Sequence, residues 1–126
     1  MQAVADSSAI LAFLFDEPGG SLVKQYAGRL FVSSVNLAEV ASKFSEQGFS
    51  ESAAEEAIAV LALEVVAFDT VQALACGKLR AATMSAGLSI GDRACIVLGI
   101  IKGLPVLTAD RVWAKIETGA KIEFIR

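Results

Sequence analysis

Histidine is absent from this sequence of 126 residues, and its absence excludes more chemistry than any other feature of the composition. Without imidazole there is no Ser-His-Asp or Cys-His triad, no histidine-ligated zinc and no imidazole acid–base catalysis. Cysteine is also scarce: Cys76 and Cys95 each lie inside an apolar, helix-like segment, where we expect buried, reduced thiols. Any catalysis must therefore use carboxylates, hydroxyls, lysine, cysteine or a metal ion held by oxygen ligands.

Charged residues make up only 20% of the chain, whereas hydrophobic residues make up 55% and the mean hydropathy is +0.59. This composition argues against disorder and predicts one compact domain that spans residues 1–126. The net charge is -3 and the pI is about 4.9, so the protein lacks the bulk positive charge with which many proteins bind nucleic acid. Phosphate binding would need a local source of positive charge, and we expect part of the apolar excess to contact a partner.

Long apolar runs, a secretory leader and phosphate-binding loops are all missing. The longest apolar run, 94–101, is far shorter than the roughly 20 residues that span a bilayer. The N-terminus has no basic segment and carries Asp6 before its apolar stretch, unlike a signal peptide. Gly19 and Gly20 are not followed by lysine and a hydroxyl at the spacing of a phosphate-binding loop. We therefore expect a soluble, cytoplasmic protein that has no membrane contact and does not hydrolyse nucleoside triphosphates.

Short β-rich runs alternate with longer segments of helical periodicity. We expect strands at 2–5, 30–33, 64–68, 106–109 and 121–125. We expect helices at 7–15, 21–28, 34–47, 50–63, 70–85 and 93–102, and a short one after Asp110. Strands separated by helices need crossover connections, so the pattern predicts an α/β fold with three layers, α/β/α, and a mainly parallel central sheet. In such folds the functional crevice lies beyond the carboxyl ends of the strands.

Four acidic residues fall where the predicted elements would bring them to that crevice. Asp6 directly follows the first predicted strand, and Asp110 directly follows the fourth. Glu39 lies about one turn into the helix after the second strand, and Asp92 lies in the first turn of the helix that precedes the fourth. Asp69 also ends a predicted strand, but its surroundings have the pattern of a helix N-cap. Four acids at one edge are unfavourable unless a cation neutralises them.

Each of the four acids also has a simpler explanation. The two that follow strands could cap the helices after them. Asp92 could close a capping box that begins at Ser89. Glu39 could form a surface pair with Lys43, four residues further along the same helix. The simpler explanation must hold four times over, whereas the functional one needs a single site.

The segments around these acids resemble the four signature blocks of PIN-domain nucleases, in particular the VapC-type toxins of bacterial toxin–antitoxin pairs. The blocks read VADSS from Val4, SSVNLAEV from Ser33, LSIGDRA from Leu88 and PVLTADRVW from Pro105. They occur in the family's order, and the resemblance extends from Val4 to the last predicted strand. One such block would be weak evidence, but four in order are highly specific.

The resemblance implies a PIN-like fold and one metal site built from four acids: Asp6, Glu39, Asp92 and Asp110. It implies four supporting side chains, two hydroxyls and two basic groups: Ser8, Thr108, Arg93 and Arg111. The implied activity is that of a metal-dependent endoribonuclease, which hydrolyses RNA phosphodiester bonds with metal-activated water. The implied partners are Mg²⁺, with Mn²⁺ as a substitute, an RNA substrate, a VapB-type antitoxin and a second copy of the chain.

Elementary electrostatics agrees with a metal site. Two unit negative charges about 4 Å apart repel by roughly 4 kcal/mol at an effective dielectric constant near 20, so clustered carboxylates need protons or cations. Carboxylates and water favour Mg²⁺ or Mn²⁺ over zinc, and the lack of histidine and of paired cysteines points the same way. A bound cation would also supply the local positive charge that an acidic protein needs to bind RNA.

Two other functions are compatible with parts of the sequence. A phosphoacceptor receiver domain has the same layers, and Asp69 and Thr108 could mimic its strand-end residues. It would need an acid next to Asp6, where Ala5 and Ser7 stand, and a lysine at the end of the fifth strand, where the sequence ends FIR. A non-catalytic interaction module would keep the fold without the chemistry, and it should show no stabilisation by Mn²⁺.

Overall fold

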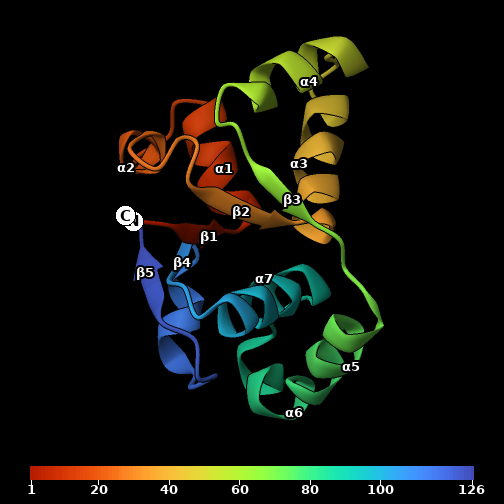
Figure 1. Ribbon diagram of the computed structural model, residues 1–126, viewed down its shortest axis with the longest axis vertical. Helices are drawn as coiled ribbons and strands as arrows, with labels where there is room; N and C mark the ends of the chain where they lie inside the picture. The colour runs from red at the N-terminus through yellow and green to blue at the C-terminus, as the bar shows by residue number, and fades with distance from the viewer.

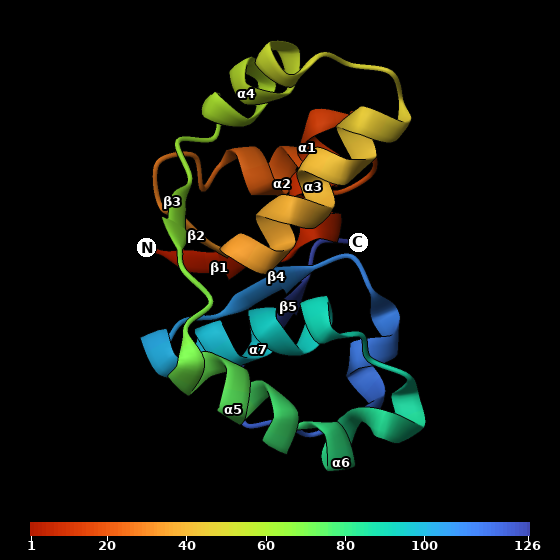
Figure 2. The same cartoon turned by 90° about the vertical axis from the view of Figure 1, so that its right-hand side faces the viewer.

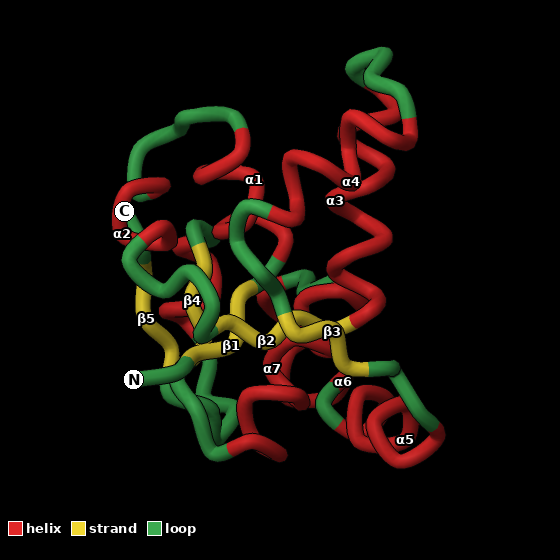
Figure 3. Tube along the Cα trace, turned by 45° about the horizontal axis from the view of Figure 1, so that its top comes forward, coloured by secondary structure: helices red, strands yellow, loops and turns green.

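The computed structural model describes residues 1–126 and contains one sheet of five parallel strands (Figure 1). The strands are β1 (Ala3–Ala5), β2 (Leu30–Ser33), β3 (Glu64–Val66), β4 (Val106–Thr108) and β5 (Ile122–Phe124). They lie in the order β3-β2-β1-β4-β5, and all four neighbouring pairs are parallel. Figure 3 shows the strands running side by side through the middle of the molecule. The prediction of a mainly parallel sheet is confirmed.

Seven α-helices and two 3₁₀ helices connect the strands. The α-helices are α1 (Ser7–Leu14), α2 (Gly20–Lys24), α3 (Ser34–Glu46), α4 (Glu51–Ala59), α5 (Thr70–Lys78), α6 (Arg80–Thr83) and α7 (Ile90–Lys102). The 3₁₀ helices are η1 (Met84–Ala86) and η2 (Arg111–Lys115). Figure 2 shows α1 to α4 on one side of the sheet and α5, α6 and α7 on the other. The three predicted layers are therefore present.

Each face of the sheet has its own hydrophobic core. On β1, Ala3 and Ala5 join the core with α1 and α3, whereas Val4 joins the core with α7, because successive side chains of a strand point to opposite faces. All three are 0% exposed, as is typical of a central strand in a parallel sheet. Cys95 belongs to the core around α7, and both cysteines are buried and free, as predicted. None of the helices, the longest of which have 13 residues, has the length and apolar character needed to cross a membrane.

Several element boundaries differ from the predicted ones, each for a local reason. The helix predicted over 70–85 is divided into α5, α6 and η1, with Leu79 between the first two. The Thr83 hydroxyl donates to the Leu79 carbonyl oxygen (2.8 Å), a type of bond that often bends helices. The helix predicted over 50–63 ends at Ala59, and Ala62 has a left-handed φ of 47° that turns the chain into β3. The helix predicted from residue 93 begins at Ile90, because Ser89 caps it.

The order of the strands reverses beside β1. The chain leaves β1 for β2 and β3 on one side, and then returns to place β4 on the other edge of β1. In an open parallel sheet such a reversal creates a crevice at the carboxyl ends of the two strands. Asp6 follows β1 and Asp110 lies two residues after β4, so both lie at this point of the fold.

Candidate active site

Asp6 is the one charged side chain among the buried residues, with 3% of its surface exposed. One carboxylate oxygen, Oδ1, accepts hydrogen bonds from the Ser8 hydroxyl (2.7 Å) and the Ala9 amide (2.8 Å), and Oδ2 accepts one from the Thr108 hydroxyl (2.5 Å). Burial nevertheless raises the pKa of Asp6 to about 6, and the negative charge of Asp92 adds to that rise. The three hydrogen bonds lower the pKa but do not offset the loss of water. A nearby cation would stabilise this carboxylate.

The two hydroxyls predicted to support the site, those of Ser8 and Thr108, join Asp6 to the segment that follows β4. The Asp110 amide donates to Thr108 Oγ1 (3.0 Å), and the Ala109 amide donates to Ser8 Oγ (2.9 Å). The two hydroxyl oxygens are 3.3 Å apart. Because both hydroxyls also donate to Asp6, they fix the position of the backbone at Asp110 relative to the buried carboxylate.

Asp92 and Asp110 each cap the helix at whose start they lie, which is the simpler explanation given for them in the sequence analysis. Asp92 Oδ2 accepts from the Ser89 amide (2.9 Å) in a complete capping box, and Asp110 Oδ1 accepts from the Val112 amide (3.0 Å). These roles do not separate the acids from one another. Burial raises the pKa of Asp92, and the negative charges of Asp110 and Glu39 raise it further. Capping is therefore confirmed for these two acids, and also for Asp6, whose side chain caps α1 through the Ala9 amide. That the acids form one functional site stays a prediction.

The alternative in which Glu39 pairs with Lys43 is wrong, because Lys43 Nζ lies 3.7 Å from Glu46 instead. Glu39 Oε1 accepts a hydrogen bond from Asn36 Nδ2 (2.8 Å), which also donates to the Gly91 carbonyl oxygen (3.1 Å). Asn36 was not among the predicted site residues. The available signal was an amide side chain three residues before a candidate ligand, which places the two side chains on one helix face.

The two arginines predicted to support the site contact other groups. Arg93 Nη1 donates to the Cys76 carbonyl oxygen of α5 (3.0 Å), while its buried Nε has no partner. The Arg111 guanidinium lies over the Phe124 ring, 4.3 Å from its centroid. Neither arginine forms an ion pair with an acid, so no cationic side chain neutralises the four carboxylates.

The structure brings the four acids to one edge of the sheet, but it does not bring three of them close enough to hold a metal ion directly. Asp92 and Asp110 each direct one oxygen to a backbone amide at the start of their own helix. The four side chains nevertheless fit a hard divalent cation, because every donor is a carboxylate oxygen. Burial, the first cause, raises the pKa of Asp6, which shows that no positive charge compensates its negative charge. Mg²⁺ or Mn²⁺ suits these residues better than zinc.

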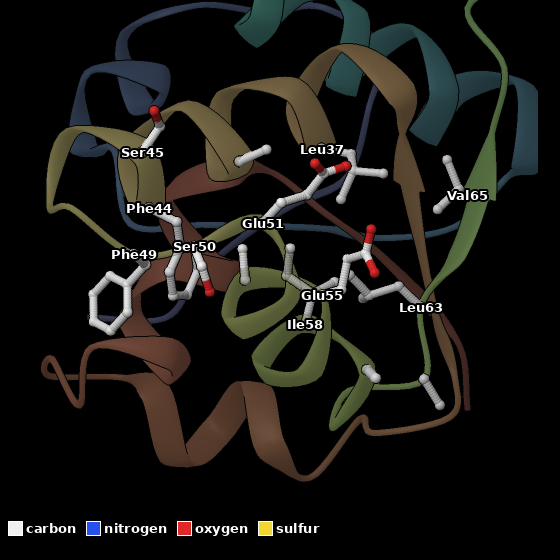
Figure 4. A pocket seen from close by; sticks show the side chains of 14 residues that line it. Leu37, Phe44, Ser45, Phe49, Ser50, Glu51, Glu55, Ile58, Leu63 and Val65 are labelled. Atoms are coloured by element: carbon white, nitrogen blue, oxygen red, sulfur yellow. The ribbon is translucent and has the colours of Figure 1, made fainter.

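A second feature lies apart from the acids. An apolar groove of about 640 Å³ runs between α3 and α4, and none of the four candidate ligands lines it. Figure 4 shows Leu37, Phe49 and Ile58 among its lining side chains, together with the acids Glu51 and Glu55. Phe49 is 48% exposed. The structure therefore leaves an apolar surface uncovered beside two negative charges.

The protein is an α/β/α domain with an acidic site. The acids lie around the crevice at β1 and β4, where the strand order reverses. The model of the PIN domain family matches residues 3–118, and the chain therefore belongs to that family. PIN domains are generally nucleases, and they generally use divalent metal ions. The family match confirms the resemblance found in the four sequence blocks, and it argues against the receiver-domain alternative.

Solved structures share this fold over the whole chain, although no curated protein sequence matches. A chain of VapBC2 from Rickettsia felis, bound to a promoter DNA fragment, has a TM-score of 0.73 and 19% identity, and covers 98% of both chains. A chain of DNA-bound VapBC from Salmonella typhimurium has a TM-score of 0.71 and 23% identity, with 100% of this chain and 99% of that one covered. A chain of VapBC-5 from Mycobacterium tuberculosis has a TM-score of 0.62 and 23% identity, with 99% and 98% covered. At these identities the likeness establishes the shared fold.

Proposed function

We propose that this protein is a metal-dependent endoribonuclease and the toxin of a VapBC-type toxin–antitoxin pair. The observation that carries the proposal is the buried Asp6 carboxylate at the switch point of the sheet, with its pKa raised by burial and by the charge of Asp92. Three further acids from other segments lie at the same edge, and no side-chain cation pairs with any of them. Membership of the PIN family and the VapBC-like fold support the same function.

Four residues would hold Mg²⁺, or Mn²⁺ in its place: Asp6, Glu39, Asp92 and Asp110. When bound, such an ion supplies positive charge to a scissile phosphate and lowers the pKa of attacking water. The hydroxyls of Ser8 and Thr108 hold the first of these carboxylates through its two oxygens. The Ser8 hydroxyl also accepts from the Ala109 amide, and the Thr108 hydroxyl accepts from the Asp110 amide. These contacts keep Asp6 and Asp110 in a fixed position relative to each other.

Arg111 and Arg93 would contribute differently. Arg111 is exposed beside Asp110 and lies over Phe124, so its guanidinium can contact an RNA phosphate without leaving the ring. Arg93 joins α7 to α5 through the Cys76 carbonyl. We therefore propose that Arg111 supports RNA binding and that Arg93 supports the position of α7, on which Asp92 lies.

A VapB-type antitoxin and a second copy of the chain are the proposed protein partners. The apolar groove between α3 and α4 suits an apolar segment of the antitoxin, with basic side chains opposite Glu51 and Glu55. A cytoplasmic location, where RNA is present and thiols stay reduced, agrees with two free cysteines.

The test uses the purified full-length protein, chelated with EDTA, and a mixed RNA substrate. Cleavage should be absent after chelation, return with Mg²⁺ or Mn²⁺, and leave 5′-phosphate and 3′-hydroxyl ends. The Asp6→Asn variant should not cleave, whereas Glu46→Gln, which removes an acid outside the site, should cleave normally. Cleavage that survives chelation, or that persists in Asp6→Asn, would refute the proposal, and a protein that neither cleaves RNA nor gains stability from Mn²⁺ would be the non-catalytic module.

A further inference from the structure

Asn36 is a buried polar side chain that none of the four sequence blocks assigns to catalysis. It lies on α3, three residues before Glu39, and is only 1% exposed. Its Nδ2 donates one hydrogen bond along its own helix, to Glu39 Oε1 (2.8 Å), and a second across to α7, to the Gly91 carbonyl oxygen (3.1 Å). One nitrogen therefore connects a candidate ligand to the helix that carries Asp92.

The amide orientation follows from its neighbours. Both groups around Nδ2 are oxygen acceptors, so a rotated amide would place Oδ1 against two oxygens and lose both bonds. The orientation with Nδ2 toward Glu39 leaves Oδ1 buried and without a partner. An unsatisfied buried acceptor costs free energy, and an apolar side chain of the same size would avoid that cost. Packing alone therefore does not explain asparagine at this position.

Gly91 supplies the space for the Glu39 carboxylate. A Cβ built on Gly91 would lie 2.5 Å from Glu39 Oε2 and 2.6 Å from Oε1, closer than real Cβ contacts come. Any other residue at position 91 would displace the carboxylate, because glutamate is the flexible partner. Gly91 is the second residue of α7, in the first turn together with Asp92. The missing side chain thus lets Glu39 approach the N-terminal turn of α7, where the macrodipole favours negative charge.

We propose that Asn36 is a positioning residue of the metal site and that Asn36 and Gly91 together fix the Glu39 carboxylate beside Asp92. Asn36 holds one carboxylate oxygen, and Gly91 leaves room for both. The inference rests on the proposed function, since it assumes that Glu39 helps to hold the metal ion. Residues that orient a ligand from behind are expected to affect metal affinity by about tenfold to a hundredfold.

The test measures Mn²⁺ binding to the full-length protein by calorimetry, with unfolding of the chelated protein in urea as a second measurement. Asn36→Leu removes the donor and also the unsatisfied acceptor, so the chelated variant should lose little stability. Gly91→Ala adds the displacing methyl group, and alanine is the better residue in a helix, so this variant should also be stable. Both should bind Mn²⁺ about tenfold to a hundredfold more weakly.

Glu39→Gln should lose Mn²⁺ affinity to a similar degree, whereas Glu46→Gln, the matched change on the same helix, should not. The double variant Asn36→Leu with Glu39→Gln separates positioning from a general structural effect. If Asn36 acts only through Glu39, its replacement should cause no further loss in the Glu39→Gln background.

The outcomes distinguish this inference from the proposed function. Wild-type affinity in Asn36→Leu and Gly91→Ala, with weak binding in Glu39→Gln, would overturn the inference and leave the nuclease intact. An equal loss from Asn36→Leu in both backgrounds, or normal binding by Glu39→Gln, would overturn it as well. Absence of Mn²⁺ binding and of RNA cleavage in the wild type would refute the proposed function itself. If Asn36→Leu unfolds, Gly91→Ala alone decides.

Discussion

Replacing Asp6 with asparagine should stabilise the metal-free protein, and the gain should depend on pH. The carboxyl of Asp6 has a pKa of about 6 in the folded protein, raised first by burial, against 3.8 for the ordinary group. Between these two values the folded state binds more protons than the unfolded state, so the free energy of unfolding falls as the pH rises through this window. A difference of about two pH units corresponds to about 3 kcal/mol once the group is fully ionised.

Asparagine removes this penalty and keeps most of the contacts. Its Oδ1 can accept from Ser8 and Ala9 as the carboxylate does, and its Nδ2 can donate to Thr108 Oγ1, which already accepts from the Asp110 amide. We therefore expect wild type and Asp6→Asn to differ little near pH 4, and the variant to be more stable by up to about 3 kcal/mol near pH 8.

Urea denaturation in EDTA at both pH values, followed by circular dichroism, measures this difference. Comparing the two proteins cancels the titration of all other groups that they share. Added Mn²⁺ should reverse the order, because binding at about 1,000 times the Kd stabilises the wild type by about 4.1 kcal/mol and the variant lacks a ligand. A stability difference that is the same at both pH values, or a variant less stable than wild type near pH 8, would refute the reasoning.

Three further predictions concern the Thr108 hydroxyl, the apolar groove and the two arginines. Thr108→Val leaves the buried Asp6 carboxylate and the Asp110 amide each short of a partner, so the free energy of unfolding should drop by about 1–3 kcal/mol, more near pH 8 than near pH 5; an unchanged urea midpoint would contradict this. Ala41→Glu places a charge in the apolar groove and should abolish antitoxin binding in a pull-down but not RNA cleavage, whereas Ser42→Glu, on the neighbouring exposed position, should affect neither; equal binding by both would place the antitoxin elsewhere. Arg111→Ala should weaken RNA binding and reduce the salt dependence by about one counterion, while Arg93→Ala should lower stability with the same salt slope; the reverse pattern would exchange their proposed roles.

The architecture could be predicted because its signals are local. Apolar β-rich runs followed by capping residues predict the positions of β1, β4 and the helices after them. The alternation of strands and helices along the chain then implies the parallel sheet. Asp6 directly follows β1 and Asp110 lies two residues after β4, so their position at the crevice could be inferred from the sequence. The division of the helix at Thr83 could not, because the hydroxyl's competition with the backbone depends on the local geometry.

Tertiary contacts decided what the sequence pattern missed. The spacing of Glu39 and Lys43 suggests an ion pair on one helix. The lack of a side chain at Gly91, 52 positions after Glu39 in the chain, instead leaves room for the carboxylate beside another helix. Likewise, the proximity of Arg93 to Asp92 in the sequence says nothing about its direction, which the carbonyl of Cys76 determines. The sequence pattern thus indicated where the acids lie in the fold. It did not indicate which groups the side chains near them contact.

The hydrogen bond between Asp6 and Thr108 joins side chains 102 positions apart in the chain. β1 and β4 are neighbours in the sheet, but β2, β3 and the helices α1 to α7 separate them in the chain. A chain without β4 and the residues after it would have neither this bond nor Asp110. The buried carboxylate therefore has all of its hydrogen-bond partners only when these two distant segments have come together.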